Sequence, residues 1–201
     1  MKIKDLMIPD PITTTEKATI EDAIELMKIN SIRHLPVVSR NLVLKGFVTL
    51  ADLKQGLIPS MVGDLSLTDL MIRKPITVTP DDDVEIAARL IYRHKIGGIP
   101  VIKAKKLVGI ITETDILRAF IDMMGILNAS SRIDVMVGNK AGAFKKASQI
   151  VHDNGGDIMN VGMMGRQKSK RTYSFRLFSC KTQNIKDALE KEGFKVLSTM
   201  D

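Results

Sequence analysis

The stretch Gly46-Phe47-Val48-Thr49-Leu50-Ala51-Asp52 returns 63 residues later as Gly109-Ile110-Ile111-Thr112-Glu113-Thr114-Asp115. Just upstream, Leu35-Pro36-Val37-Val38 returns as Ile99-Pro100-Val101-Ile102, 64 residues on. Self-similarity at a fixed spacing indicates a structural unit that the chain uses more than once. Two further pairs share the spacing of 64: Asp5-Leu6-Met7-Ile8 with Asp69-Leu70-Met71-Ile72, and Pro11-Ile12-Thr13 with Pro75-Ile76-Thr77. The first part of the chain, about 120 residues, therefore contains one unit twice.

Both copies have the same pattern of elements. Apolar residues at i, i+3, i+4 and i+7 predict a helix over residues 20–27 and another over 84–91. A short apolar strand, a turn and a second strand led by the repeated glycine follow. A second helix is expected to begin near Thr49 in one copy and near Thr112 in the other. With the Pro-Ile-Thr strand ahead, each unit reads βαββα, and two units packed by pseudo-twofold symmetry would bury each other's apolar faces.

Composition narrows the class of protein. The chain has 201 residues, a net charge of +7, three histidines and one cysteine, Cys180. One cysteine forms no intramolecular disulfide and no cysteine-rich zinc site, and the widely spaced histidines offer no metal-ligand pattern. The charged N-terminus lacks the apolar core of a signal peptide, and no apolar run reaches the length of a membrane span. We therefore expect a cytoplasmic protein without a metal or a membrane contact.

The last third of the chain follows another pattern. Alternating apolar residues predict a strand over 133–137, helical spacing predicts a helix over 144–151, and Asn154-Gly155-Gly156 ends that helix. Two strands joined by a polar turn at 165–171, a helix near 185–189 and a last strand come next. The order is βαββαβ, a ferredoxin-like split βαβ. We therefore expect an α+β protein in which this domain follows the two repeats.

The repeated order of motifs resembles a cystathionine-β-synthase (CBS) domain. In each copy Asp-Leu-Met, Pro-Ile-Thr, a helix, Leu/Ile-Pro-Val and Gly-x-x-Thr-x-x-Asp follow one another. The tandem pair is similar to a Bateman module, with one repeat in residues 1–60 and the other in 61–125. The resemblance implies regulatory binding of an adenine nucleotide. It also implies a homodimer, because Bateman modules commonly pair into a flat disc.

Residues 131–201 resemble an ACT domain, a small regulatory module that often binds amino acids. The resemblance rests on the loop Asn139-x-x-Gly142-x-Phe144, which opens the first predicted helix of this domain. The usual Asp/Arg-Pro-Gly is Lys140-Ala141-Gly142 here, which departs from the pattern that accompanies amino-acid binding. ACT domains pair through their sheets, so this domain is expected to dimerise or to bind a second small ligand. Two CBS repeats followed by an ACT-like domain resemble the acetoin-utilisation AcuB family, which implies a link to acetoin metabolism.

The repeated Thr-x-x-Asp has two interpretations. A threonine at a helix start with a carboxylate three residues on forms a capping box. A helix start also offers free N–H groups to phosphate, the Thr hydroxyl adds a hydrogen bond, and the Asp carboxylate accepts hydrogen bonds from both ribose hydroxyls. We favour a ligand site, because the motif occurs twice after a glycine-led strand. In the CBS family the Asp binds ribose and the Thr binds phosphate, which implies Asp52 and Thr49 in the first copy and Asp115 and Thr112 in the second.

The adenine base would lie in an apolar slot beside the first strand of each copy. Backbone groups would meet the edge of the base and a proline would pack near its face, with ordinary core packing as the alternative role for these residues. The first copy would use Ile12, Thr13, Thr14 and Pro36, and the second Ile76, Thr77, Val78 and Pro100.

The copies differ where the phosphate would lie. Arg33-His34 stands in the first copy where Gly97-Gly98 stands in the second, and Glu113 adds a negative charge to the second motif. Arginine can clamp phosphate with two hydrogen bonds, and histidine can add a donor. We therefore expect the first copy to take the phosphate and the second to take a neutral adenosine-type group or nothing, with a surface ion pair as the alternative role of Arg33. Neither motif contains Arg or Lys, which favours AMP or ADP over ATP as the ligand.

Basic charge offers a second interpretation of function. Residues 131–201 hold 13 of the 30 Lys and Arg but 7 of the 23 Asp and Glu, and residues 166–171 form a basic tip between two strands. Such a surface attracts nucleic acid or an acidic partner, although no RNP-type or helix-turn-helix pattern accompanies it. No Ser-His-Asp order, Walker loop or dinucleotide glycine pattern supports an enzyme. We expect a non-catalytic regulator of a downstream protein, with a nucleic-acid-binding protein as the alternative.

Overall fold

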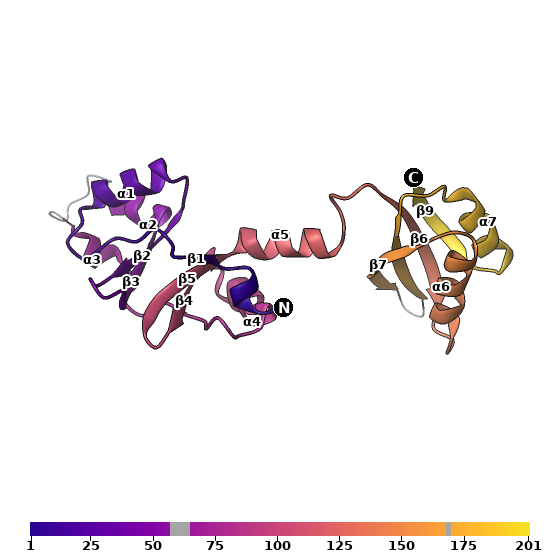
Figure 1. The fold of residues 1–201 in the computed structure, drawn as a ribbon, viewed down its shortest axis with the longest axis horizontal. Coiled ribbons are helices and arrows are strands. Elements are labelled where there is room, and N and C mark those ends of the chain that lie inside the picture. Colours follow the sequence, from indigo (N-terminus) through magenta and orange to yellow (C-terminus); the bar gives the residue numbers. More distant parts are fainter. Residues whose placement is uncertain (57–64, 168–169) are drawn as a thin grey trace. The chain divides into compact units, whose positions relative to one another are not determined.

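A computed structural model describes residues 1–56, 65–167 and 170–201. It divides into two compact units, Met1–Leu117 and Arg118–Asp201, shown in ribbon form in Figure 1. The N-terminal unit contains both repeats. The C-terminal unit contains the predicted third domain.

In the described residues up to 56, the first repeat has two helices beside a two-stranded sheet (Figure 1). Its elements are α1 (Ile20–Ile29), β2 (His34–Val38), β3 (Leu44–Thr49) and α2 (Leu50–Gly56). Helix α1 begins where the Thr19 hydroxyl accepts a hydrogen bond from the Asp22 N–H. Strands β2 and β3 are antiparallel, and Met27 of α1 and Leu35 of β2 are fully buried together in the core of this repeat. The predicted helix α1, the two paired strands and a helix that begins beside Thr49 are therefore confirmed for this copy.

The second repeat has the same elements at the predicted positions. They are α4 (Val84–His94), β4 (Gly98–Lys103), β5 (Lys106–Thr112) and α5 (Glu113–Met123). Strand β5 pairs with β4 and also with the short β1 (Ile8–Pro9), so the sheet order is β1-β5-β4. Helix α5 continues past Leu117, the last residue of the N-terminal unit.

The leading segment of each repeat packs into the core of the other repeat. Ile3, in the 3-10 turn η1 (Ile3–Asp5), is fully buried in the core of the second repeat. The short helix α3 (Leu67–Leu70) contributes Leu67, and Met71 follows it, to the core of the first repeat. The two repeats are therefore interlocked rather than merely apposed.

The strand predicted at Pro-Ile-Thr is reduced in both copies to a single bridge. Thr14 bridges to Val37 and Val78 to Val101, each parallel. Prolines 9 and 11 precede the first bridge, and prolines 75 and 80 flank the second. Each lacks a backbone donor, which disfavours a longer ladder.

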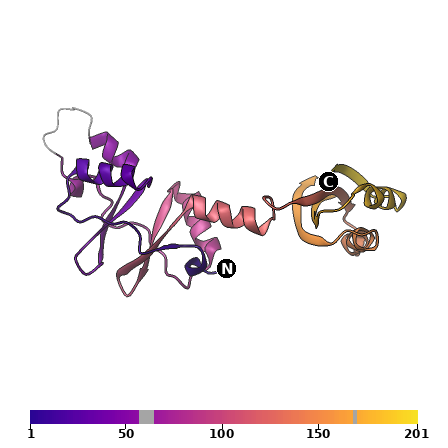
Figure 2. The ribbon, with the colours of Figure 1, turned by 45° about the horizontal axis from the view of Figure 1, so that its top comes forward.

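The C-terminal unit is a four-stranded antiparallel sheet with two helices on one face (Figure 2). Its elements are β6 (Ser130–Gly138), α6 (Ala143–Asp153), β7 (Ile158–Gln167), β8 (Lys170–Phe178), α7 (Gln183–Lys191) and β9 (Lys195–Met200). The predicted order βαββαβ is observed, with the strands arranged β7-β8-β6-β9. Val135, Phe175 and Ile185 are fully buried between the sheet and the helices.

The basic hairpin differs from its prediction. The sequence predicted a polar turn over 165–171, but β7 runs to Gln167 and β8 begins at Lys170. Residues 168 and 169 of the predicted basic tip lie outside the described residues.

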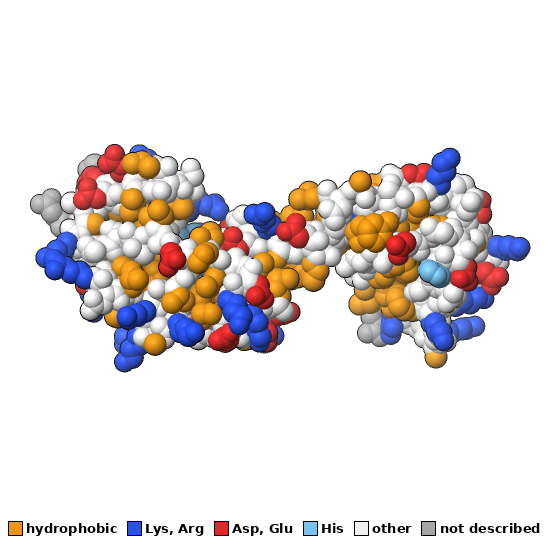
Figure 3. Space-filling model, viewed as in Figure 1, with side chains coloured by type: hydrophobic (Ala, Val, Ile, Leu, Met, Phe, Trp, Pro, Cys, Tyr) orange, Lys and Arg blue, Asp and Glu red, His pale blue; other side chains and the backbone are white. Residues whose placement is uncertain are grey.

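Apolar side chains reach the surface of both units between charged ones, as the face drawn in Figure 3 shows. In the described parts of the chain, every helix is too short or too polar to cross a membrane.

Candidate functional site

A cleft of about 790 Å³ lies between the two repeats of the N-terminal unit. Its walls come from the start of β2, the junction of β3 and α2, the chain around Ile72–Ile76, and the stretch His94–Gly98 with Glu113. Its size is in the range of small-molecule sites. Seven of the predicted nucleotide-binding residues line it: Arg33, His34, Thr49, Asp52, Ile76, Gly97 and Gly98.

Thr49 and Asp52 form a capping box at the start of α2. Asp52 Oδ2 accepts hydrogen bonds from the Thr49 hydroxyl at 2.6 Å and from the Thr49 N–H at 3.1 Å, and the Asp52 N–H donates to Thr49 Oγ1 at 3.2 Å. Thr112 and Asp115 make the same three contacts at the start of α5. The capping interpretation therefore describes both motifs as they stand. The box uses only Oδ2 of Asp52, so a capping role does not engage the other carboxylate oxygen of this cleft-lining residue.

His34 occupies the room that two glycines of the second repeat leave. A Cβ built on Gly97 would lie 2.7 Å from His34 Nε2, and one built on Gly98 would lie 3.2 Å from His34 Cγ. The imidazole also stacks on Phe47, with ring centroids 6.0 Å apart and planes 15° from parallel. The sequence predicted that Arg33-His34 and Gly97-Gly98 distinguish two sites. In the structure the two pairs meet, because the His34 side chain of the first copy packs against the glycine backbone of the second.

Burial lowers the pKa of His34 below its ordinary 6.5, and the neighbouring positive charge of Arg33 lowers it further, while Glu113 and Asp52 oppose the shift. As the pH falls, the unfolded chain therefore binds a proton at His34 at a higher pH than the folded chain does. We expect the free energy of unfolding to be unaffected by this group above about pH 6.5 and to fall as the pH is lowered from there. Urea unfolding at pH 7.5 and pH 5.5 tests this, since His34→Gln should show a smaller loss than the unchanged chain.

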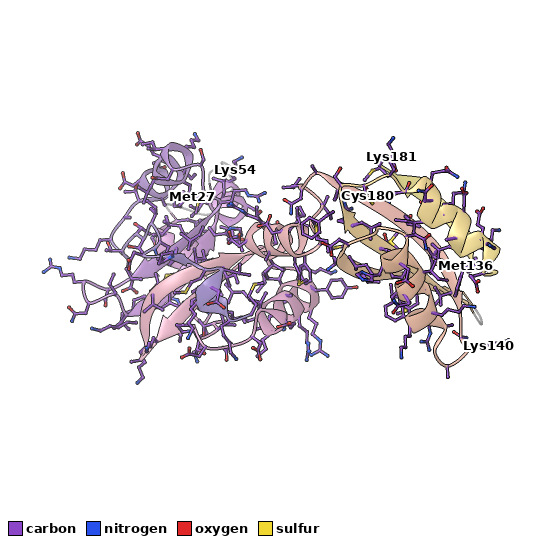
Figure 4. All side chains as sticks on the ribbon, turned by 45° about the vertical axis from the view of Figure 1, so that its right-hand side comes forward. Met27, Lys54, Met136, Lys140, Cys180 and Lys181 are labelled. Atoms are coloured by element: carbon purple, nitrogen blue, oxygen red, sulfur yellow. The ribbon has the colours of Figure 1, made fainter. Side chains whose placement is uncertain are left out.

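Three lysines join the cleft that the sequence reasoning missed. They are Lys54 on α2, which Figure 4 labels, Lys74 before Pro75, and Lys95 after α4. All three line the cleft with Arg33. The sequence argument for few positive groups considered only the two residues between Thr and Asp in each motif. The cleft as a whole contains more positive side chains than that argument assumed. The signal was present in the sequence, because Lys74 directly precedes Pro75-Ile76 and Lys54 follows Asp52 by two residues.

The chain between Ile72 and Val78 changes the predicted grouping of residues. Ile72 pairs with Phe47 of the first repeat and Val78 with Val101 of the second, so the segment crosses from one repeat to the other. Ile76 therefore lies in the cleft with Asp52, whereas the sequence grouped it with Asp115.

Several predicted contacts to adenine are already used by the sheets. The Thr14 N–H donates to the Pro36 carbonyl and the Thr14 carbonyl accepts from the Val38 N–H. Val78 is bonded in the same way to Pro100 and Ile102. These backbone groups do not face a ligand, because strand bridges satisfy them. Of the described residues, the following predicted ones do not line the cleft: Ile12, Thr13, Thr14, Pro36, Thr77, Val78, Pro100, Thr112 and Asp115.

Glu113 also differs from its predicted place. The sequence put its charge in the path of phosphate in the second copy. In the structure its Oε1 lies 3.8 Å from Nη2 of Arg33 of the first copy, and both residues line the cleft. The ion pair that the sequence offered as an alternative role for Arg33 is therefore present.

The predicted loop of the C-terminal unit lies between β6 and α6. Gly142 is the N-cap of α6 with a φ of 81°, a conformation that favours glycine, and open space surrounds the position of its missing Cβ. Phe144 packs on Tyr173 with ring centroids 4.8 Å apart. Asn139 is exposed beside Lys140, which Figure 4 labels in this loop. Among the described residues, no group of three His, Cys, Asp or Glu side chains is arranged to hold a metal ion.

Comparison with known proteins agrees with the repeats. The model of the CBS domain matches residues 3–58 and 63–122. The uncharacterized protein YlbB of Bacillus subtilis is 36% identical over 117 residues, which are 57% of this chain and 79% of that protein. A homoserine O-acetyltransferase of Methanocorpusculum labreanum is 38% identical over 51% of this chain and 20% of its own length. The chain thus spans about a fifth of the curated enzymes that it matches.

Solved structures resemble the N-terminal unit. The CBS domain pair of protein MJ0100, in complex with 5′-methylthioadenosine and S-adenosyl-L-methionine, is 30% identical with a TM-score of 0.56 and covers 60% of this chain and 95% of that one. An acetoin utilization protein (AcuB) of Vibrio cholerae is 32% identical with a TM-score of 0.56, over 63% and 95%. CBSX2 of Arabidopsis thaliana in complex with AMP is 30% identical with a TM-score of 0.54, over 61% and 97%.

Proposed function

Because the chain belongs to the CBS-domain family, we propose that it is a non-catalytic regulatory protein that senses an adenine nucleotide in the cleft between its two repeats. The observation that carries the proposal is the convergence of Arg33, Thr49 and Asp52 on that cleft. A ribose could bind at Asp52 Oδ1 while Thr49 and Arg33 face the phosphate. The solved structures with AMP and with methylthioadenosine support an adenosine group as the core of the ligand.

Charge favours a phosphorylated ligand in this cleft. Arg33, Lys54, Lys74 and Lys95 line it against Asp52 and Glu113. A guanidinium and three ammonium groups attract phosphate more than they attract an uncharged nucleoside or a sulfonium. AMP and ADP remain the proposed ligands, and the additional lysines make ATP a ligand to be tested beside them.

For the C-terminal unit we propose an ACT-like domain with a ferredoxin-like fold, in residues 131–201. The strand order β9-β6-β8-β7 and the glycine at the start of α6 support it. Its proposed role is to dimerise the chain or to bind a second small ligand. Nucleotide binding would then bias one arrangement of the repeats and change the activity of a downstream protein in the cytoplasm. The likeness to an AcuB structure supports a link to acetoin utilisation.

Thermal unfolding with AMP, ADP, ATP and S-adenosyl-L-methionine tests the proposed sensor. A ligand at ten times its dissociation constant stabilises a protein by about 1.4 kcal/mol, which we expect for AMP or ADP. Asp52→Asn should abolish the stabilisation. Asp115→Asn is the matched control, because Asp115 forms the same capping box outside the cleft.

Two results would contradict this proposal in different ways. If none of the nucleotides stabilises the unchanged chain, the repeats do not sense an adenine nucleotide. If Asp115→Asn removes the effect of AMP and Asp52→Asn keeps it, the nucleotide binds elsewhere than in this cleft.

A further inference from the structure

The two repeats make equivalent backbone hydrogen bonds beside the cleft. The Leu50 N–H donates to the Arg33 carbonyl at 3.0 Å, and the Glu113 N–H donates to the Gly97 carbonyl at 3.0 Å. Arg33 and Gly97 therefore hold equivalent positions, and so do Leu50 and Glu113. These positions differ in charge between the copies, although the backbone around them is conserved by the repeat.

One ionic contact results from those differences. Glu113 Oε1 lies 3.8 Å from Nη2 of Arg33, across the boundary between the repeats. The symmetry-related contact would join Gly97 and Leu50, neither of which carries a charge. The ion pair therefore has no counterpart under the pseudo-twofold symmetry of the repeats.

The carboxylate of Glu113 stands where a ligand's anionic group would meet Arg33. Both residues line the cleft with Thr49 and Asp52. The side chains of Arg33 and Glu113 are 66% and 55% exposed, so the pair is solvated and separates at small cost. Because the Glu113 carboxylate partly neutralises the Arg33 guanidinium, a ligand's phosphate and Glu113 compete for the same positive charge.

We propose that Glu113 determines the charge specificity of the cleft: its carboxylate holds Arg33 as an internal anion until the phosphate of a bound nucleotide replaces it. The inference rests on the proposed function. An uncharged nucleoside leaves the pair intact and gains nothing from Arg33. A nucleoside monophosphate or diphosphate gains Arg33 but must displace Glu113 and bind beside its negative charge. Glu113 thus weakens the binding of anionic ligands and leaves that of neutral ones unchanged.

Calorimetric titration of the full chain with AMP and with adenosine tests the proposal. Glu113→Gln should strengthen AMP binding by about fivefold, the size of effect expected for an exposed charge pair. It should change adenosine binding by less than about twofold. Arg33→Gln should weaken AMP binding alone, and in the Arg33→Gln background Glu113→Gln should strengthen it less than in the unchanged chain, because freeing Arg33 no longer contributes.

Glu85→Gln is the matched control, because Glu85 is an exposed acidic residue in the first turn of α4, outside the cleft. It removes the same charge from the same repeat and should leave both affinities unchanged. If Glu113→Gln leaves the ratio of AMP to adenosine affinity unchanged, or weakens AMP, Glu113 is not the competing anion. If neither ligand binds the unchanged chain or any variant, the proposed function itself is wrong, and this inference with it.

Discussion

Replacing Gly97 with valine should weaken AMP binding by about fivefold to 150-fold, the equivalent of the 1–3 kcal/mol that overpacking costs. The Cβ alone would stand 2.7 Å from Nε2 and 3.0 Å from Cε1 of His34. The two added methyl groups would occupy the hollow that receives the imidazole. Because the ring also stacks on Phe47, a displaced imidazole must move Phe47 or give up that stacking, and both residues line the cleft. Either movement alters the wall that faces the nucleotide. Calorimetric titration with AMP measures the loss.

A second substitution separates the steric cause from others. His34→Ala in the Gly97→Val background removes the ring that the valine displaces, so the double variant should bind AMP better than Gly97→Val alone. Gly138→Ala, where an added Cβ meets no atom within 4 Å, is the control for a glycine substitution and should leave the affinity unchanged. An additive loss in the double variant would mean that His34 and Gly97 act independently, contrary to the packing described.

The repeat was enough to predict most of the fold of the N-terminal unit. Helical spacing and the paired strands put α1, α4 and the two β-hairpins at their observed places, because those elements depend on local periodicity. The exchange of leading segments was not predictable in this way. The sequence shows only that Ile3 and Met71 are apolar residues near a predicted element. The tertiary structure shows which core each one enters.

The sequence named some of the residues that line the cleft and missed others. Thr49 and Asp52 belong to the repeated Thr-x-x-Asp, and Arg33 stands at the position where the copies differ, so the sequence singled out all three. Ile76 was grouped with the wrong copy because the crossing of residues 72–78 depends on pairing with two different strands. Lys95 was missed because it belongs to no motif, and only the position of α4 brings it to the cleft. Residue type indicated the chemistry, but the long-range pairing decided which residues meet.

The crossing segments also explain the glycine that begins each Gly-x-x-Thr-x-x-Asp. A Cβ built on Gly109 would lie 2.6 Å from Sδ of Met7 and 3.1 Å from the Ile8 carbonyl. Gly46 stands in the same relation to Met71 and to the Ile72 carbonyl, which lies 3.3 Å from its Cβ position. The glycine is therefore required by the close passage of the other repeat's leading segment.

Gly46→Ala should accordingly lower the free energy of unfolding of the N-terminal unit by about 1–3 kcal/mol. Met71 is buried in the core of the first repeat, and Ile72 exchanges two backbone hydrogen bonds with Phe47. The added methyl group must therefore displace a buried side chain and press on a paired backbone carbonyl 3.3 Å from it. Urea unfolding followed by circular dichroism measures the change. Gly109→Ala should behave alike, whereas Gly138→Ala should change stability by less than about 1 kcal/mol because it meets open space. Equal stability of Gly46→Ala and Gly138→Ala would contradict this prediction. It would show that the chain at Met71 and Ile72 does not pack tightly against β3 at Gly46.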